Sequence, residues 1–290
     1  MSRRNWTLFA LVGILWGIPY LLMKVAVREF PPTVVVFARV LVGFLVLIPL
    51  ALSRKTFIHA LGYWRRIGIY AIAEMVLPWI LITTAEKRLS SGLAGLLVAT
   101  VPIFATILAS VNGDKSVWHR KRLFGIIIGF IGLVLVVGIE SLSGHQDPLS
   151  IAMIICASAL YAWAVNMINI KIPHVDAIAM NGLAMLFTAI IYLPFAIGQW
   201  PKTAPNSEGY LAIISLGLFP TALAFVLYFM LMKEIGQARG SLVTYLNTAV
   251  AVLLGVLLLR EPLTLGIIVG LPLVLIGSYF ASRQHESATQ

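Results

Sequence analysis

Residues 138–150 read Gly-Ile-Glu-Ser-Leu-Ser-Gly-His-Gln-Asp-Pro-Leu-Ser, a polar stretch without Lys or Arg between two long apolar runs. We count five apolar segments before this stretch, called the central seam below, and five after it. An odd number of membrane spans in each half makes the second half enter the membrane from the opposite side. The pattern therefore predicts two inverted repeats, over residues 1–140 and 141–290, an architecture common among secondary transporters.

The composition places the chain in a membrane. It has 290 residues, of which 60% are hydrophobic and 11% are charged, whereas a soluble domain carries about 25% charged residues. A spanning helix needs roughly 20 apolar residues, so ten of them leave room only for short connections. We predict an all-α integral membrane protein with ten transmembrane helices, at about 6–27, 32–52, 66–85, 90–110, 122–139, 148–169, 176–197, 210–232, 240–259 and 264–282.

The basic residues indicate orientation. The net charge is +10, and most Lys and Arg fall in the connections that share a side with the N-terminus. Such clustering is typical of cytoplasmic loops and explains the charge better than nucleic-acid binding does. We expect both termini in the cytoplasm, and no nucleic-acid partner.

Two further patterns support a repeat and a transport role. Trp16-Gly17 is echoed by Trp163-Ala164, and the glycine pair at 125 and 129 is echoed at 266 and 270. Prolines inside a helix remove backbone hydrogen bonds, and in a membrane the freed carbonyls must find partners or line a cavity. Seven prolines fall inside expected helices: Pro19, Pro49, Pro78, Pro102, Pro194, Pro220 and Pro272.

The first expected helix carries an aromatic stripe. Gly13, Trp16, Gly17 and Tyr20 recur at spacings of three and four, so they share one helix face. Trp16 is either a buried packing residue or the wall of a central cavity, and its echo at Trp163 favours the wall. We assign Trp16, Tyr20 and Trp163 to a substrate site.

The third expected helix carries an acid within the membrane. Glu74 shares a face with Pro78, and Trp79 follows directly. An intramembrane acid is costly and is protonated, paired or exposed to water. One interpretation is a structural ion pair with Arg39 of the second helix, and the other is contact with a substrate amine or a proton. We assign Glu74, Pro78 and Trp79 to the substrate site.

Neutral polar residues lie in the sixth and ninth expected helices. Asn166 follows Trp163 at helical spacing, and Thr244, Tyr245 and Asn247 cluster together. Such side chains either hydrogen-bond neighbouring helices or line a cavity. Both interpretations stay open, and we include Asn166, Thr244, Tyr245 and Asn247 among the substrate-binding candidates.

The sequence lacks the signature motifs of several other classes of protein. The sequence has no Walker loop, no HExxH motif, and no His/Cys ligand cluster, and its five histidines all fall in expected loops or the tail. We therefore expect no catalytic residues, no metal and no cofactor. The GxxxG pairs favour close helix packing within one chain or between chains, so the protein is a monomer or a homodimer.

The chain resembles the EamA branch of the drug/metabolite transporter superfamily over nearly its whole length. The resemblance rests on Trp16-Gly17, on Gly92, Gly95 and Gly240 near helix starts, on the acids Asp114 and Glu261, and on the glycine-patterned fifth and tenth helices. It departs where Pro102 has no proline counterpart at residues 247–249. The resemblance is nearest to YddG-type amino-acid exporters and implies a multi-pass protein of the bacterial inner membrane.

These observations lead to three hypotheses. The first is a secondary exporter of amino acids that works by alternating access around a midplane cavity between the repeats. The second keeps the fold and changes the cargo to another metabolite, a drug or a lipid-linked molecule. The third is a membrane-embedded enzyme, which needs clustered acids or histidines that the sequence does not supply.

Overall fold

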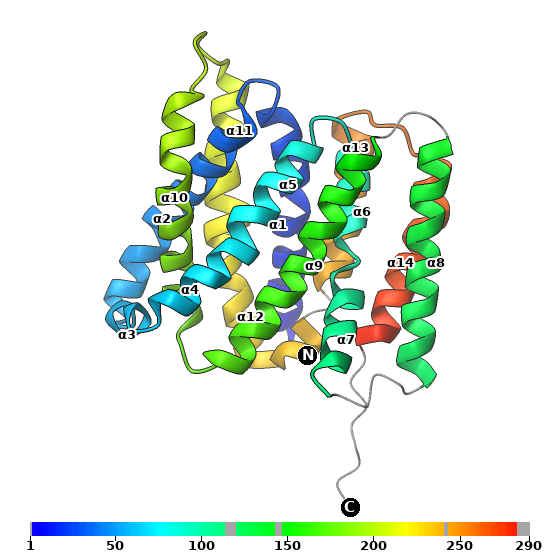
Figure 1. Ribbon diagram of the computed structural model, residues 1–290, viewed down its shortest axis with the longest axis horizontal. Helices are drawn as coiled ribbons and strands as arrows, with labels where there is room; N and C mark the ends of the chain where they lie inside the picture. The colour runs from blue at the N-terminus through cyan, green and yellow to red at the C-terminus, as the bar shows by residue number, and fades with distance from the viewer. Residues whose placement is uncertain (1, 114–119, 143–146, 241–242, 283–290) are drawn as a thin grey trace, which may run out of the picture.

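The computed structural model describes residues 2–113, 120–142, 147–240 and 243–282, and contains helices but no strand over them (Figure 1). The elements are α1 (Arg3–Ala26), α2 (Pro32–Ser53), α3 (Phe57–Leu61), α4 (Trp64–Ala71), the π-helical segment η1 (Ile72–Val76), α5 (Leu77–Ala85), α6 (Ser91–Val98), α7 (Val101–Val111), α8 (Arg120–Leu142), α9 (Pro148–Lys171), α10 (Ala177–Gly198), α11 (Ser207–Gly217), the π-helical segment η3 (Leu218–Leu223), α12 (Ala224–Gly240), α13 (Val243–Leu258) and α14 (Leu265–Ser282).

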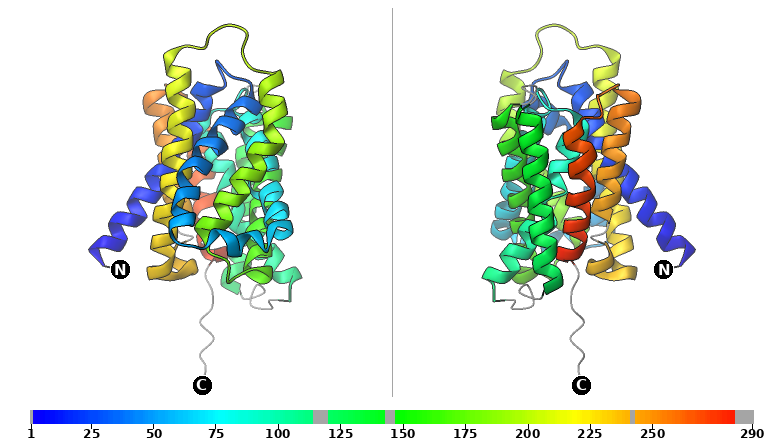
Figure 2. Two further views of the ribbon diagram at one scale, coloured as in Figure 1. Left: turned by 90° about the vertical axis from the view of Figure 1, so that its left-hand side faces the viewer. Right: turned by 90° about the vertical axis from the view of Figure 1, so that its right-hand side faces the viewer.

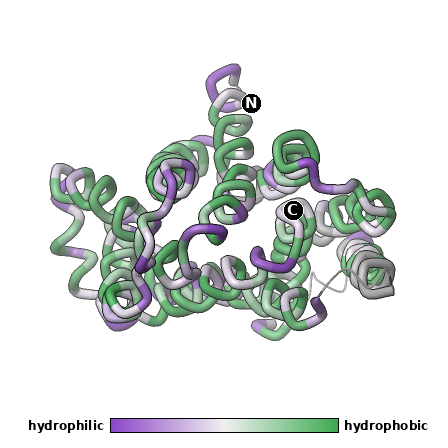
Figure 3. Tube along the Cα trace, turned by 90° about the horizontal axis from the view of Figure 1, so that it is seen from above, coloured by the Kyte–Doolittle hydropathy of each residue, from purple (hydrophilic) through white to green (hydrophobic). Residues whose placement is uncertain are grey.

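The helices fit the predicted class. Within the described residues, seven helical stretches are long and apolar enough to cross a membrane, and three shorter apolar helices accompany them. The seven are Arg3–Ala26, Pro32–Ser53, Trp64–Ala85, Ser91–Val111, Pro148–Lys171, Ala177–Gly198 and Ser207–Ile235, and the shorter ones are Leu123–Leu135, Val243–Leu258 and Leu265–Gly277. Apolar residues dominate the helix traces (Figure 3). The prediction of an all-α membrane protein is confirmed.

The helices begin where the sequence supplies caps. The Asp147 side chain accepts a hydrogen bond from the backbone N–H of Ser150, and Asp176 accepts from Ile178 and Ala179. Each bond satisfies a donor that the first helical turn leaves without a partner. Prolines 32 and 148 occupy the first turns of α2 and α9, where a missing N–H costs nothing.

The two halves run in opposite directions. α1 starts at the end of the molecule where both termini lie, whereas α9 starts at the far end (Figure 1). Equivalent helices of the two halves pack on each other, namely α2 on α10, α8 on α14, and α6 on α13. The predicted inverted repeats would produce this kind of pairing. Residues 143–146 of the central seam, and Asp114, lie outside the described residues.

Prolines mark the breaks in three spans. Pro78 follows η1, Pro220 lies within η3, and Pro102 follows the break between α6 and α7. π-Helical turns inside α-helices accommodate such breaks and often lie at functional sites. Pro19, Pro49, Pro194 and Pro272 instead lie inside continuous helices.

Side-chain hydroxyls donate hydrogen bonds to backbone carbonyls near both π-helical segments. The Tyr192 hydroxyl donates to the Val76 carbonyl at 2.8 Å, and the Thr221 hydroxyl donates to the Leu216 carbonyl at 2.8 Å. Pro220 cannot donate to the carbonyl four residues earlier, which is Leu216. Thr221 therefore supplies the hydrogen bond that its neighbour removes, as the membrane interior demands.

Glycines let helices of the two halves touch, although the contact of α14 uses Gly277 and not the predicted pair at 266 and 270. A side chain on Gly13 or Gly17 of α1 would collide with α13, at Leu246 and Val250 respectively. A side chain on Gly277 of α14 would overlap the backbone of Gly129 in α8. These small residues are therefore used for close packing inside one chain.

The end opposite the termini is tied together by polar contacts. Lys24 Nζ donates to the backbone carbonyls of Glu86 at 2.7 Å and Leu89 at 2.5 Å, so it satisfies the end of α5. The Glu261 carboxylate accepts from the backbone N–H groups of Ser91 and Gly92 at the start of α6. At the other end, the first turns of α1 lean away from the bundle (Figure 2).

Candidate functional site: a central cluster of aromatic and charged residues

Glu74 lies on the π-helical segment η1, in the middle of the third span. Its Oε2 is buried and has no hydrogen-bond partner. Its carboxyl group lies within electrostatic range of the hydroxyls of Tyr70 on α4, Tyr161 on α9 and Tyr228 on α12. An acid thus stands among aromatic side chains drawn from three spans and both halves.

Arg39 of α2 approaches the same region from another side. Its side chain is buried, its guanidinium carbon lies 3.7 Å from the centre of the Trp79 ring, and its Nε donates to Thr221 Oγ1 at 2.7 Å. A cation over an indole face is attracted by the ring quadrupole. The hydroxyl of Thr221 is itself held by the Leu216 carbonyl, so η3 fixes where Arg39 points.

The structure answers whether Glu74 and Arg39 form an ion pair. Among the residues described, the ion pairs join Arg4 to Glu234 and Arg88 to Asp147. Arg39 is directed instead to Trp79 and Thr221, so the ion pair that one of the two interpretations required is not formed.

Aromatic rings complete the arrangement. The Trp16 ring lies 4.5 Å from that of Tyr228 and 6.0 Å from that of Phe225, between ring centroids. Tyr20, on the same face of α1, is buried and interacts electrostatically with Arg39. We call the following set the central cluster: Trp16, Tyr20, Arg39, Tyr70, Glu74, Trp79, Tyr161, Thr221, Phe225 and Tyr228.

Half of the predicted site residues belong to this region. Trp16, Tyr20, Glu74 and Trp79 are in the central cluster, and Pro78 is buried directly after η1. The structure therefore brings one stripe of α1 and the acid-bearing third span to one place.

Trp163 does not join the cluster. It is 41% exposed, and no ring packs against it among the aromatic contacts of the described residues. Tyr161 takes the inward position on α9 instead. Two residues along a helix point roughly 200° apart, so Tyr161 and Trp163 cannot both face the centre.

The other predicted residues stand apart as well. Asn166 is half-buried on α9. Tyr245 packs its ring on Tyr279 of α14, with 6.3 Å between centroids, and Asn247 is buried where α13 meets α1. The Thr244 carbonyl accepts from the hydroxyl of Thr248, which also lies 3.3 Å from Asn247 Oδ1. Of the two open interpretations, helix-to-helix contact fits the residues of α13.

Sequence reasoning did not assign Tyr70, Tyr161, Thr221, Phe225 and Tyr228 to the site, and it treated Arg39 only as a possible partner of Glu74. One signal was present for Thr221. The offset of 147 residues that relates Trp16 to Trp163 carries Glu74 to Thr221 (74 plus 147). The aromatic residues of α9 and α12 carry no such signal, because many aromatics in the chain face lipid instead.

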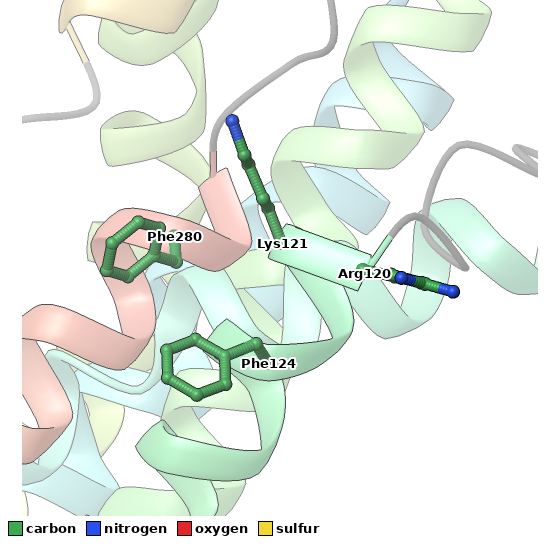
Figure 4. Close-up of a pocket in the computed structure, with 4 residues that line it drawn as sticks. All are labelled: Arg120, Lys121, Phe124 and Phe280. Carbon is green, nitrogen blue, oxygen red and sulfur yellow. The ribbon is translucent and has the colours of Figure 1, made fainter.

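A separate pocket of about 380 Å³ lies at the end of α8 and α14 nearer the termini. Arg120, Lys121, Phe124 and Phe280 line it, and the two phenylalanine rings lie 5.9 Å apart between centroids (Figure 4). It shares no residue with the central cluster. Within the described part of the chain, no group of three His, Cys, Asp or Glu is arranged to hold a metal ion.

Comparisons with known proteins agree with this architecture. The model of the EamA-like transporter family matches residues 5–138 and again residues 149–283. A Bacillus subtilis protein named uncharacterized transporter YoaV is 26% identical over 277 residues, covering 92% of this chain and 93% of its own length. The uncharacterized inner membrane transporter YedA of Escherichia coli K12 is 28% identical over 285 residues, covering 94% of this chain and 90% of its own.

A solved structure shares the fold. One crystal structure superposes with a TM-score of 0.67 over 97% of this chain and 98% of its own, at 19% sequence identity. Together with the family matches over both halves and the apolar helices, these findings lead to one conclusion. The chain belongs to the EamA-like transporter family and is a multi-pass membrane transporter.

Proposed function

We propose that this transporter exports amino acids across the inner membrane by alternating access, with the substrate bound at the central cluster. The observation that carries the proposal is the unpartnered Oε2 of Glu74 among the hydroxyls of Tyr70, Tyr161 and Tyr228. A buried carboxylate without a partner is expensive unless a cation or a proton neutralises it. An ammonium group supplies that charge, and the surrounding aromatic faces attract it further.

The position of the cluster fits alternating access. Glu74 and Thr221 lie on η1 and η3, the corresponding breaks of two inverted spans. Substrates of inverted-repeat carriers bind near the midplane, where helices are interrupted. The larger packed core covers the end away from the termini, and includes Leu89, Leu93 and Ile154. Rocking of the halves about the cluster opens one end while the other is closed.

The proposed orientation has both termini in the cytoplasm and the central seam in the periplasm. The distribution of Lys and Arg along the connections favours it. The close approach of Gly129 and Gly277 already occupies the glycine surfaces of α8 and α14. We therefore favour a monomer over a homodimer that pairs through these glycines.

Counterflow in proteoliposomes tests the function. Purified protein is loaded with unlabelled L-phenylalanine, L-leucine or L-threonine, and entry of the same radiolabelled amino acid is followed. We expect accumulation above protein-free vesicles. Absence of counterflow for every amino acid, together with counterflow of a sugar, a drug or a lipid precursor, would assign the second cargo class.

Glu74→Gln locates the site. It keeps the size of the side chain and removes its charge, so we expect amino-acid counterflow to fall by about 10-fold or more, because charge-assisted contacts contribute on the order of 1.5–3 kcal/mol. Size exclusion in detergent should be unchanged. Glu208→Gln, on the exposed first turn of α11, is the matched control and should transport normally. Normal transport by Glu74→Gln would place the substrate elsewhere.

A further inference from the structure

Arg39 has unused hydrogen-bonding capacity. A guanidinium carries five N–H donors. In the structure only Nε donates, to Thr221, while the terminal Nη1 and Nη2 groups make no hydrogen bond within the described residues. The residue as a whole is 8% exposed, and its terminal nitrogens are not among the fully buried atoms without a partner, so a small ligand can reach them.

Arg39 also lacks a countercharge. Neither ion pair of the described residues includes it. Arginines this deeply buried are nearly always paired, because an isolated buried charge is costly. The face of Trp79 attracts the cation but offers no acceptor for its terminal N–H groups. Arg39 is therefore placed to bind an anion that the chain does not supply.

Glu74 likewise lacks a partner, but it is an acid where Arg39 is a base. Its Oε2 has no partner, and it belongs to the same cluster. Tyr161 connects the two residues, because it belongs to the same cluster and its hydroxyl interacts electrostatically with both Glu74 and Arg39. A positive and a negative side chain thus share one neighbour but do not neutralise each other.

From this arrangement we propose that Arg39 and Glu74 form a two-point site for a zwitterion, in which Arg39 binds the α-carboxylate and Glu74 binds the α-ammonium group. The inference rests on the proposed function. It names the two side chains that distinguish amino acids from simple amines and from carboxylic acids. An arginine fork matches both oxygens of a carboxylate, which gives direction as well as affinity.

The π-helical segments explain how the chain keeps these opposite charges apart. η1 carries Glu74, and η3 carries the Thr221 hydroxyl that holds Arg39 Nε at 2.7 Å. Stacking on Trp79 fixes the guanidinium plane on its other side. A site held open in this way does not collapse into an internal ion pair when it is empty.

Ligands that lack one charge test the proposal. Counterflow of radiolabelled L-phenylalanine and L-leucine is competed with the unlabelled amino acids, with their amides, which lack the carboxylate, and with 3-phenylpropionate and 4-methylpentanoate, which lack the amine. For the wild-type protein we expect half-inhibition by each amino acid at a concentration about 10-fold or more below that of either partner compound.

The variants assign each charge. Arg39→Gln should weaken inhibition by the amino acids by about 10- to 100-fold, so that they inhibit no better than their amides. Glu74→Gln should instead abolish the preference for the amino acids over 3-phenylpropionate and 4-methylpentanoate. Arg39→Lys keeps a cation over Trp79 but loses the planar fork, so the preference for amino acid over amide should shrink several-fold. It also provides the test if Arg39→Gln fails to fold, as judged by size exclusion.

Arg66→Gln is the matched control, because Arg66 lies on the exposed surface of α4 and donates to the Lys171 carbonyl. It should keep the wild-type preferences. If Arg39 only holds Trp79 and Thr221 in place, its variants will weaken all three ligand types in parallel, and that result overturns the two-point site while amino-acid transport stands. No counterflow of either amino acid by wild-type protein overturns both proposals.

Discussion

η1 and η3 lie 146 residues apart (218 minus 72), at matching places in the third and eighth spans. Both interrupt an α-helix beside a proline, and a side-chain hydroxyl bonds a backbone carbonyl near each of them. Their chemistry differs, because η1 carries Glu74 where η3 carries Pro220 and Thr221. Both halves contain a π-helical break beside a proline, whereas the acidic residue Glu74 lies in the break of the first half.

The same contrast recurs elsewhere in the molecule. The contact between α8 and α14 is built from glycines that both halves contribute, Gly129 and Gly277. Trp16 and Trp163 correspond in sequence, yet only Trp16 reaches the central cluster. Shared features therefore form the scaffold, and under the proposed function the features confined to one half bind the substrate. Variants in each group should fail in different ways.

The largest effect should come from a shared contact. A leucine at Gly277 overlaps the Gly129 backbone, which cannot rotate away as a side chain can. Overpacking costs roughly 1–3 kcal/mol and more where backbone must move. We expect Gly277→Leu to yield little monodisperse protein in size-exclusion chromatography.

Gly198→Ala is the matched control, since an added Cβ there meets nothing within 4 Å. It should behave as wild type. Full recovery of folded and active Gly277→Leu protein would show that α8 and α14 separate without penalty, and that this contact does not support the fold.

A smaller effect should separate the two tryptophans. Trp16→Ala removes a ring that packs on Tyr228 and Phe225, so amino-acid counterflow should slow several-fold. Trp163→Ala removes a ring that is 41% exposed, and its effect on stability should stay within about 0.5 kcal/mol. Counterflow rates and thermal unfolding in detergent measure both changes. Equal loss of transport in the two variants would mean that the halves are functionally equivalent.

The fold was largely predictable from the sequence. Ten apolar stretches and a central seam without basic residues are enough to predict the spans, because a membrane demands long apolar helices and satisfied backbones. What the pattern could not supply was which prolines would distort a span. Pro78 and Pro220 adjoin π-helical turns, whereas Pro19 and Pro49 lie in continuous helices.

The candidate site was only partly predictable. Glu74 and Trp16 are unusual in a membrane helix, and the glycine stripe and the echo at Trp163 drew further attention to Trp16. Tyr161 and Tyr228 are ordinary aromatics in a chain rich in them, so only helix rotation distinguishes them from lipid-facing rings. Trp163 was assigned by sequence correspondence, but the rotation of α9 turns Tyr161 inward instead.

The smallest predicted effect concerns a surface link between the halves. Arg88 Nη1 lies 3.1 Å from Asp147 Oδ2, joining the connection before α6 to the start of α9. The hydrogen bond from the Ser150 hydroxyl, and then the contact with Arg88, lower the pKa of Asp147 from its ordinary 3.8. An acid whose pKa is lower in the folded than in the unfolded protein stabilises the fold at pH values above its unfolded pKa. This contribution disappears as the pH falls through the folded pKa.

Asp147→Asn isolates that charge, since asparagine also serves as an N-cap. The variant should unfold at a slightly lower temperature than wild type at about pH 6, and the difference should vanish as the pH falls below about 4. The shift should be small, because exposed pairs contribute little. Thermal unfolding across this range measures it, and Arg88→Gln should show the same convergence at acid pH. A difference that stays constant at every pH would mean that Asp147 acts only as a cap of α9, and that no charge joins the halves at this point.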